Sequence, residues 1–160
     1  MHYSKDFKIK SMIYLVIFVS TVFIDQFTKH FVLNKIGLNN SQDFIPGIVN
    51  LTVVQNTGGA FSIFQQHPIY FKIIGIINIF IFSYLTFCPT VILKSITKAG
   101  CAFILGGTIG NLIDRFLVSG VIDFIDLKLF NFAIFNLADV FIDIGVILIL
   151  VGWFLSNKKH

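Results

Sequence analysis

The chain contains few charged residues for its length. They make up 12% of its 160 residues, whereas a soluble domain carries about a quarter. Glutamate is absent, and Arg115 is the only arginine. Hydrophobic residues reach 56%, and the mean hydropathy is +0.86. This composition excludes an ordinary soluble domain, and we expect an integral membrane protein.

Cysteine is scarce too, with Cys88 and Cys101 each standing alone in or beside a hydrophobic run. Neither belongs to a CxxC pair or a Cys/His cluster, so the sequence predicts no metal centre, no disulfide framework and no cofactor. The net charge of +4 comes from lysines gathered at both ends of the chain and within 94–98. Such groups are typical of topology signals and lipid-headgroup contacts, and they do not predict a nucleic-acid surface.

What the chain does have is four hydrophobic runs, each near the length of about 20 residues that a membrane-spanning helix needs. They cover about 12–33, 69–88, 99–119 and 133–155. If both chain ends lie inside, all of these lysine groups face the cytoplasm, which is the side where positive residues concentrate in membrane proteins. The sequence therefore predicts that both termini are cytoplasmic. We therefore expect a single domain over residues 1–160, an all-α membrane protein with four transmembrane helices.

A small β segment is predicted on the outer face, between the first and second helices. It covers about 44–66, where β-branched residues lie between Pro46-Gly47 and Gly58-Gly59.

The unusual polar residues of the chain all fall near the predicted outer surface. In chain order they are Asp25, Lys29, Asn56, Asn111, Asp114, Arg115, Asp123, Asn136 and Asp139. A charge at the centre of a membrane helix costs about 2.5–3.5 kcal/mol, so these side chains are expected to face one another rather than lipid. The guanidinium of Arg115 can donate hydrogen bonds to two planar acceptors at once, which predicts that Arg115 holds a carboxylate network. The Gly106–Gly110 pair, a GxxxG pattern, predicts helix packing.

Two of these carboxylates could carry chemistry. Aspartates held close together cannot both ionise, so one can act as general base on a water while its protonated partner polarises a carbonyl. The chain has no GxSxG or HExxH pattern. An intramembrane aspartyl hydrolase is one hypothesis, and a proton-coupled membrane transport component is the alternative. Spacing alone does not decide whether Asp114 or Asp123 is one of the pair.

Five short blocks resemble the lipoprotein signal peptidase family, also called signal peptidase II. They are "DQFTK" at 25–29, "NTGGAFS" at 56–62, "GGTIGNLIDR" at 106–115, "GVIDF" at 120–124 and "FNLAD" at 135–139. They follow the order of the family and extend from the first predicted span to the fourth. Gly59 stands where alanine is common, and Asp143 has no place in the family pattern.

The resemblance implies an aspartyl endopeptidase of the bacterial cytoplasmic (inner) membrane, with its active site near the outer leaflet surface. Its substrates would be diacylglyceryl-modified prolipoproteins, cut just before the lipidated cysteine. The outer β segment at about 44–66 would rest on the lipid headgroups and form a cradle for these substrates. The enzyme's other contacts would be membrane lipids and inhibitors of the globomycin type, which are cyclic peptides. Asp123, on a mobile outer loop, and Asp139 would be catalytic. The residues that bind substrate or support this pair would be Asp25, Lys29, Asn56, Gly58, Asn111, Asp114, Arg115 and Asn136.

Overall fold

The computed structural model describes residues 2–157 apart from 59–67 and 130–131. This part of the chain forms four helices and a three-stranded sheet. In chain order the elements are α1 (His2–Ile36), β1 (Ser41–Ile45), β2 (Val49–Asn56), α2 (Pro68–Phe87), α3 (Ser95–Leu117), β3 (Val121–Leu127) and α4 (Leu137–Asn157). The predicted fold class, apolar helices with a small β element, is confirmed.

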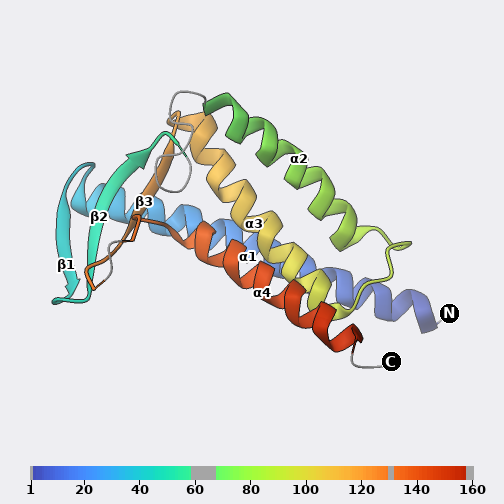
Figure 1. Ribbon diagram of the computed structural model, residues 1–160. Coiled ribbons are helices and arrows are strands. Elements are labelled where there is room, and N and C mark those ends of the chain that lie inside the picture. Colours follow the sequence, from blue (N-terminus) through green and yellow to red (C-terminus); the bar gives the residue numbers. More distant parts are fainter. Residues whose placement is uncertain (1, 59–67, 130–131, 158–160) are drawn as a thin grey trace.

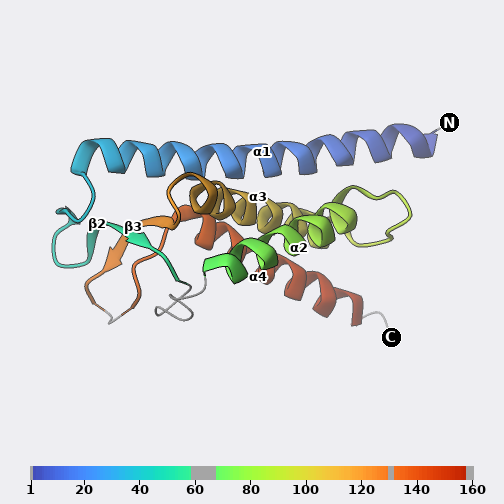
Figure 2. The ribbon, with the colours of Figure 1, turned by 90° about the horizontal axis from the view of Figure 1, so that it is seen from above.

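The helices form a bundle, and the sheet lies at one end of it (Figure 1). Both chain termini lie at the opposite end, and α1 runs the full length of the bundle along one side (Figures 1 and 2). The helical segments long and apolar enough to cross a membrane are Lys8–Ile36, Ile69–Phe87, Ser95–Leu117 and Leu137–Asn157. The protein is therefore a multi-pass membrane protein.

Local sequence sets the helix boundaries. α1 ends before Gly37, whose φ of 87° is a left-handed conformation that glycine adopts without strain. Pro68 opens α2, where its missing N–H would have had no helical partner. α4 begins at Leu137, later than the predicted start at about 133, because Phe135 pairs with Ile125 in an isolated β-bridge.

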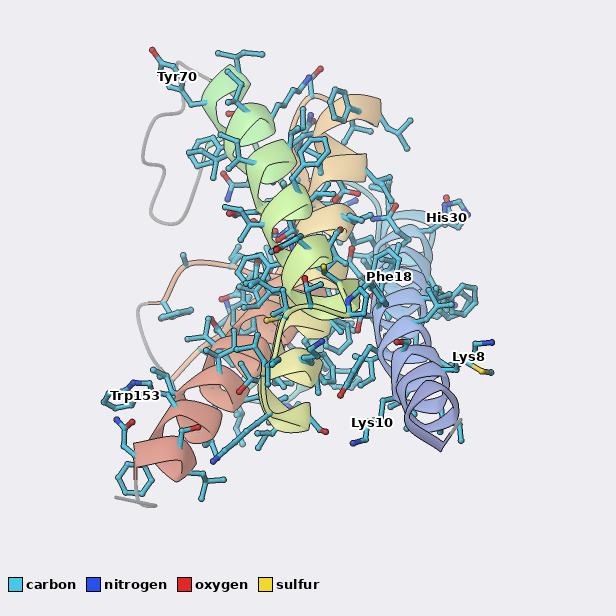
Figure 3. All side chains as sticks on the ribbon, turned by 90° about the vertical axis from the view of Figure 1, so that its right-hand side faces the viewer. Lys8, Lys10, Phe18, His30, Tyr70 and Trp153 are labelled. Atoms are coloured by element: carbon cyan, nitrogen blue, oxygen red, sulfur yellow. The ribbon has the colours of Figure 1, made fainter. Side chains whose placement is uncertain are left out.

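α3 lies at the centre of the bundle and contacts α1, α2 and α4. In its most apolar 18-residue stretch 67% of the residues are buried, against 17% in α1 and α4 and 6% in α2. Figure 3 views the bundle from the end that holds the termini and shows α1 and α4 on either side of α3. The outward faces of α1, α2 and α4 are therefore left to contact lipid.

The predicted GxxxG pair packs α3 against α1. A Cβ added at Gly106 would lie 2.7 Å from Cβ of Thr21, and one added at Gly110 would overlap the carboxylate of Asp25. Only a residue without a side chain allows the two helices to approach this closely. The two glycines thereby bring Asp25 of α1 against the half of α3 that lies nearer the sheet.

The sheet has the strand order β1-β2-β3, and both strand pairs are antiparallel. Pro46 and Gly47 occupy the turn between β1 and β2, where Gly47 has a φ of 74° and the N–H of Ile48 donates to the carbonyl of Ile45 at 2.9 Å. This is a type II turn, which favours proline followed by glycine. The buried residues that fix the sheet to the end of α1 are Val32, Val53, Ile122 and Phe124.

The prediction of the β segment was incomplete. Its first part is a hairpin over Ser41–Ile45 and Val49–Asn56, and its last part, 59–66, lies outside the described residues. The third strand comes from Val121–Leu127, between α3 and α4. The sheet is therefore assembled from two distant parts of the chain.

The predicted location of Asp123 in a mobile outer loop was wrong. Asp123 lies within β3, paired with Val54 of β2, and Asp126 lies three positions along the same strand. The sequence "VIDFIDL" is rich in β-branched and apolar residues that suit a strand. Hydrogen bonds to β2 satisfy its backbone, so the Asp123 side chain projects from a fixed strand.

Candidate active site

The residues singled out from the sequence converge where the sheet meets the adjoining ends of α3 and α4. A cavity of about 330 Å³ lies there, within the size range of ligand pockets. The predicted residues that line it are Asn56, Gly58, Asn111, Arg115, Asp123 and Asp139. The rest of its wall is mostly apolar and consists of Val121, Phe132, Ala133, Ile134, Phe135, Ile142 and Asp143. Carboxylates from a strand and from a helix therefore face one cavity.

Asp123 reaches the cavity from β3 and is buried, with only 2% of its surface exposed. Its Oδ2 accepts a hydrogen bond from Asn56 Nδ2 at 3.0 Å, and its Oδ1 accepts one from Asn136 Nδ2 at 2.6 Å. Burial raises the pKa of Asp123 to about 6, and the charge of Asp139 adds to the rise while the two amide donors oppose it. Asp123 therefore exchanges its proton much closer to neutral pH than an ordinary aspartate does.

Asp139 lies in the first turn of α4 and is fixed by a reciprocal capping arrangement with Asn136. The backbone N–H of Asp139 donates to Asn136 Oδ1 at 3.1 Å, and the backbone N–H of Asn136 donates to Asp139 Oδ2 at 3.2 Å. Both donors would otherwise be unsatisfied at a helix start. The other carboxylate oxygen of Asp139 accepts a bond from Asn111 Nδ2 at 2.8 Å.

Two buried asparagines connect the carboxylates of Asp123 and Asp139. Asn136 Nδ2 donates to Asp123 and also, at 3.1 Å, to Asn111 Oδ1, while Asn111 donates to Asp139. Both asparagines are buried, with Asn136 at 0% and Asn111 at 7% exposure. Because each amide contacts one carboxylate and the other amide, the relative position of the two carboxylates is set by hydrogen bonds.

Beneath the cavity lies a buried ion cluster made of Asp25, Lys29 and Asp114. Lys29 Nζ lies 2.9 Å from Asp25 Oδ2 and 2.9 Å from Asp114 Oδ2, and it donates to Asn111 Oδ1 at 3.0 Å. An ammonium has three N–H donors, so all of them have partners here. The ion cluster thereby joins α1 to α3 directly below the asparagine that holds Asp139.

The two aspartates of the ion cluster also hold backbone groups next to the cavity. Asp25 Oδ1 accepts the N–H of Ala138 at 2.9 Å, and Ala138 immediately precedes Asp139. Asp114 Oδ2 accepts the N–H of Ile122 at 3.1 Å, and Ile122 immediately precedes Asp123. The negative charge of Asp25 at the N-terminus of α4 also suits the helix dipole.

Comparison with known proteins identifies the family. A sequence profile described as signal peptidase (SPase) II matches residues 17–155. The chain belongs to the signal peptidase II family. The lipoprotein signal peptidase of Trichormus variabilis is 37% identical to it over 131 residues, which cover 81% of this chain and 82% of that protein. The lipoprotein signal peptidase of Lactobacillus johnsonii is 35% identical over 152 residues, covering 95% and 98%.

A solved structure supports the same relationship. A bacterial membrane enzyme determined by the in meso method is similar with a TM-score of 0.83 and 30% identity, covering 92% of this chain and 90% of that one. As a member of the signal peptidase II family, the protein is a membrane peptidase and therefore a hydrolase. Within the described residues, His, Cys and Asp form no group of three or more that could hold a metal ion.

In this signal peptidase II protein the single arginine of the sequence lines the cavity, and Lys29 makes the ion pairs with the buried acids. Arg115 lines the cavity, donates from Nη1 to the carbonyl of Asn111 at 3.1 Å and stacks on Phe71 at 5.2 Å. Its guanidinium lies within electrostatic range of Asp139, Asp123 and Asp114, but the ion pairs of Asp114 and Asp25 are made by Lys29. Lys29 has this position because it lies on the face of α1 that packs against α3.

Gln26 is a site residue that the sequence reasoning missed. Its Nε2 lies 3.1 Å from Asp25 Oδ2, 3.1 Å from the Gly110 carbonyl and 3.0 Å from Asp114 Oδ1. It therefore adds a neutral donor between the two acids of the ion cluster. The signal was present in the sequence, since Gln26 is an amide inside an apolar run and belongs to the "DQFTK" block.

Proposed function

We propose that this peptidase is an intramembrane aspartyl endopeptidase that removes the signal peptide from diacylglyceryl-modified bacterial prolipoproteins, cutting before the lipidated cysteine. The observation that carries the proposal is that Asp123 and Asp139 face one cavity and are linked through Asn136 and Asn111. These two aspartates are the proposed dyad.

The proposed dyad divides the work of peptide hydrolysis between an acid and a base. Asp123 is assigned the proton, because burial raises its pKa from the ordinary aspartate range to about 6. Asp139 takes a proton from water as the water oxygen attacks the scissile carbonyl carbon, while Asp123 gives its proton to the carbonyl oxygen. The C–N bond then breaks as Asp139 protonates the leaving nitrogen and Asp123 recovers a proton from the gem-diol.

The polar residues around the proposed dyad hold the substrate backbone. Arg115 and Asn56 line the cavity and present donors to it, so they are suited to bind carbonyl groups of an extended peptide. The apolar wall, which includes Phe132, Ile134 and Ile142, is suited to the hydrophobic part of the signal peptide. The diacylglyceryl chains would remain in the lipid that surrounds the helices.

The remaining residues act on the proposed dyad as positioning residues. Asp25 and Asp114 hold the backbone immediately before Asp139 and Asp123, respectively. Lys29 balances the charge of both, and burying them without it would be costly. Asp123 lines the cavity, whereas Asp114 is absent from the cavity lining and pairs with Lys29 instead. This favours Asp123 over Asp114 as the catalytic partner.

We infer that the sheet end of the bundle faces the outside of the bacterial inner membrane. Lys8 and Lys10 project from the end that holds the termini (Figure 3), and Lys94 immediately precedes α3 at that same end. Lysines concentrate on the cytoplasmic side of membrane proteins. The cavity would then lie near the outer leaflet surface, where a lipidated substrate arrives.

Cysteine labelling in cells tests the orientation. In a variant lacking Cys88 and Cys101, a cysteine at exposed Asn40 should react with an impermeant maleimide added outside, and a cysteine at exposed Thr90 should not. The reverse labelling pattern would mean that the sheet end faces the cytoplasm, and it would contradict an outward-facing cavity.

The test of function is cleavage by purified protein in detergent. A diacylglyceryl-modified prolipoprotein should be cut immediately before the modified cysteine, as read by mass spectrometry, and globomycin should block the cut. The unmodified precursor is the matched control and should remain intact. Family membership favours this activity over the transport alternative; proton flux through liposomes without any cleavage would reverse that preference.

A further inference from the structure

The proposed mechanism leaves one carboxylate of the cavity without a role, that of Asp143. Asp143 follows Asp139 by four residues on α4, so the two side chains share a helix face and both line the cavity. A step of four residues along an α-helix is about 6 Å. Asp143 therefore lies one helical turn further from the sheet end, deeper in the membrane-spanning segment.

Asp143 is exposed and carries no internal partner. Within the part of the chain that the structure describes, its carboxylate forms no hydrogen bond or ion pair. Every other aspartate that contacts the site is satisfied: Asp25 and Asp114 by Lys29, and Asp123 and Asp139 by amides. Asp143 is thus the cavity carboxylate with acceptor sites to spare.

The location of Asp143 is costly for a residue without a function. α4 continues from it along an exposed apolar face that includes Val146, Ile147 and Leu150, at 44%, 58% and 59% exposure. Ionisable residues within a membrane span face a cavity or the bundle interior, and they mark substrate pathways. Asp143 stands where the cavity gives way to the lipid-facing surface, on the path of a peptide that enters from the membrane.

The distance between Asp139 and Asp143 defines which part of a substrate Asp143 would meet. An extended peptide advances about 3.3 Å per residue, so the about 6 Å between the two positions corresponds to about two residues. The proposed function, on which this step rests, leaves the signal peptide on the membrane side of the cut. The residue facing Asp143 is then the second one before the scissile bond.

We propose that Asp143 is a specificity-determining residue that accepts a hydrogen bond from a donor side chain, a hydroxyl above all, two residues before the cut. An ionised carboxylate only accepts hydrogen bonds, and an apolar side chain against it would displace water without replacing its hydrogen bond. The enzyme therefore prefers serine to alanine at this substrate position.

Substrate pairs test this preference. Diacylglyceryl-modified substrates carry a single alanine-to-serine change at each of the four positions before the cut, and kcat/KM is measured for each pair. Wild-type protein should prefer serine by about tenfold at the second position, as expected for a hydrogen bond to a charged group. Asp143→Leu should reduce that ratio to near one, because leucine offers no acceptor to the serine hydroxyl.

Control variants separate Asp143 from its surroundings. Ile147→Ala, on the same exposed face of α4 but outside the cavity lining, should keep the wild-type ratio. Asp143→Asn keeps an acceptor oxygen and should retain part of the serine preference. Thermal unfolding of each variant shows that the change in ratio does not come from misfolding.

The outcomes distinguish this proposal from the one before it. If wild-type protein cuts none of the modified substrates, the proposed function fails and this inference falls with it. If wild-type protein cuts them but the serine-to-alanine ratio is the same in Asp143→Leu, the peptidase assignment stands and the role of Asp143 is refuted.

Discussion

The carboxylate of Asp114 accepts the backbone N–H of Ile122 at 3.1 Å, one residue before Asp123. Asp25 makes the equivalent contact with the residue before Asp139. Each member of the proposed dyad thus projects from a backbone position that a buried aspartate holds. Because positioning and chemistry belong to different carboxylates, mutations can separate them.

Asparagine substitutions test the chemistry. Asp123→Asn and Asp139→Asn preserve size but remove the exchangeable proton, so each should lower kcat/KM by about 10³-fold, the range of general acid–base catalysis. The double variant should be little worse than either single one, since groups that act as a unit are not additive. Asp126→Asn, in the same strand as Asp123 but outside the cavity lining, is the control and should keep normal activity.

A different pattern would reassign the dyad. If Asp123→Asn keeps wild-type cleavage while Asp114→Asn inserts and melts normally but is inactive, Asp114 takes the catalytic role.

The pH dependence of kcat/KM reports ionisation in the free enzyme. The proposed mechanism needs Asp123 protonated, and burial raises its pKa to about 6, so kcat/KM should fall as the pH rises through about 6. The Asn56 amide opposes this rise by donating to the carboxylate. Asn56→Leu should therefore raise the pKa of Asp123 further and move the falling limb to higher pH. Thr57→Ala, at the exposed neighbouring position, should leave the limb in place.

The same pKa shift of Asp123 makes a prediction about stability. The pKa of about 6 in the folded protein lies above the unfolded value of about 3.9. The stabilising contribution of Asp123 is therefore complete below about pH 4 and is lost as the pH rises through about 6. Asp123→Asn does not titrate, so its melting temperature relative to wild type should increase between pH 4 and pH 7. A constant difference across that range would contradict the raised pKa.

Lys29→Met tests the ion cluster. Without the ammonium, Asp25 and Asp114 remain buried without their counter-charge, which should destabilise the protein by about 3–5 kcal/mol. Thermal unfolding in detergent measures the effect. Lys128→Met is the matched control, because Lys128 pairs with Asp126 at 2.7 Å but is 44% exposed; its loss should cost less than about 1 kcal/mol. Equal melting temperatures for the two variants would contradict a stabilising role for the ion cluster.

Arg115→Lys keeps the charge at the cavity but loses the planar guanidinium. An ammonium does not stack in the same way on Phe71 or present two parallel donors to a peptide. We expect kcat/KM to fall about tenfold, the value of one hydrogen bond to a charged group, with little change in melting temperature. Lys72→Arg, where the cation lies 4.9 Å from the Phe116 ring, keeps its contact and should act like wild type. Full activity in Arg115→Lys would reduce the role of Arg115 to charge alone.

The helices could be predicted because the membrane imposes a simple requirement, an apolar run of about 20 residues. The third strand could not, since "VIDFIDL" is short and becomes a strand only by pairing with β2, whose residues lie about 70 positions earlier in the chain. A short segment between two membrane spans is predicted as a loop unless the strand with which it pairs is known. This is why Asp123 was predicted on a loop.

The site residues were visible because polar side chains in apolar spans are rare and must find partners. The sequence did not indicate which partner each of these side chains contacts. Whether Lys29 or Arg115 reaches the acids depends on the rotation of α1 and α3 about their axes, which the close contact at Gly110 fixes. The contacts of Asp25 and Asp114 with backbone N–H groups were also hidden, because every residue except proline carries such a group.

The contact of Asp25 with the N–H of Ala138 spans 113 positions, from the first helix to the last. During synthesis the chain enters the membrane in order, so this bond forms only after α4 has been inserted beside α1. Until then the backbone N–H of Ala138 lacks its hydrogen bond to Asp25. The backbone before Asp139 is consequently held only after the last helix has inserted beside the first, so this part of the site is completed only when the whole bundle has closed.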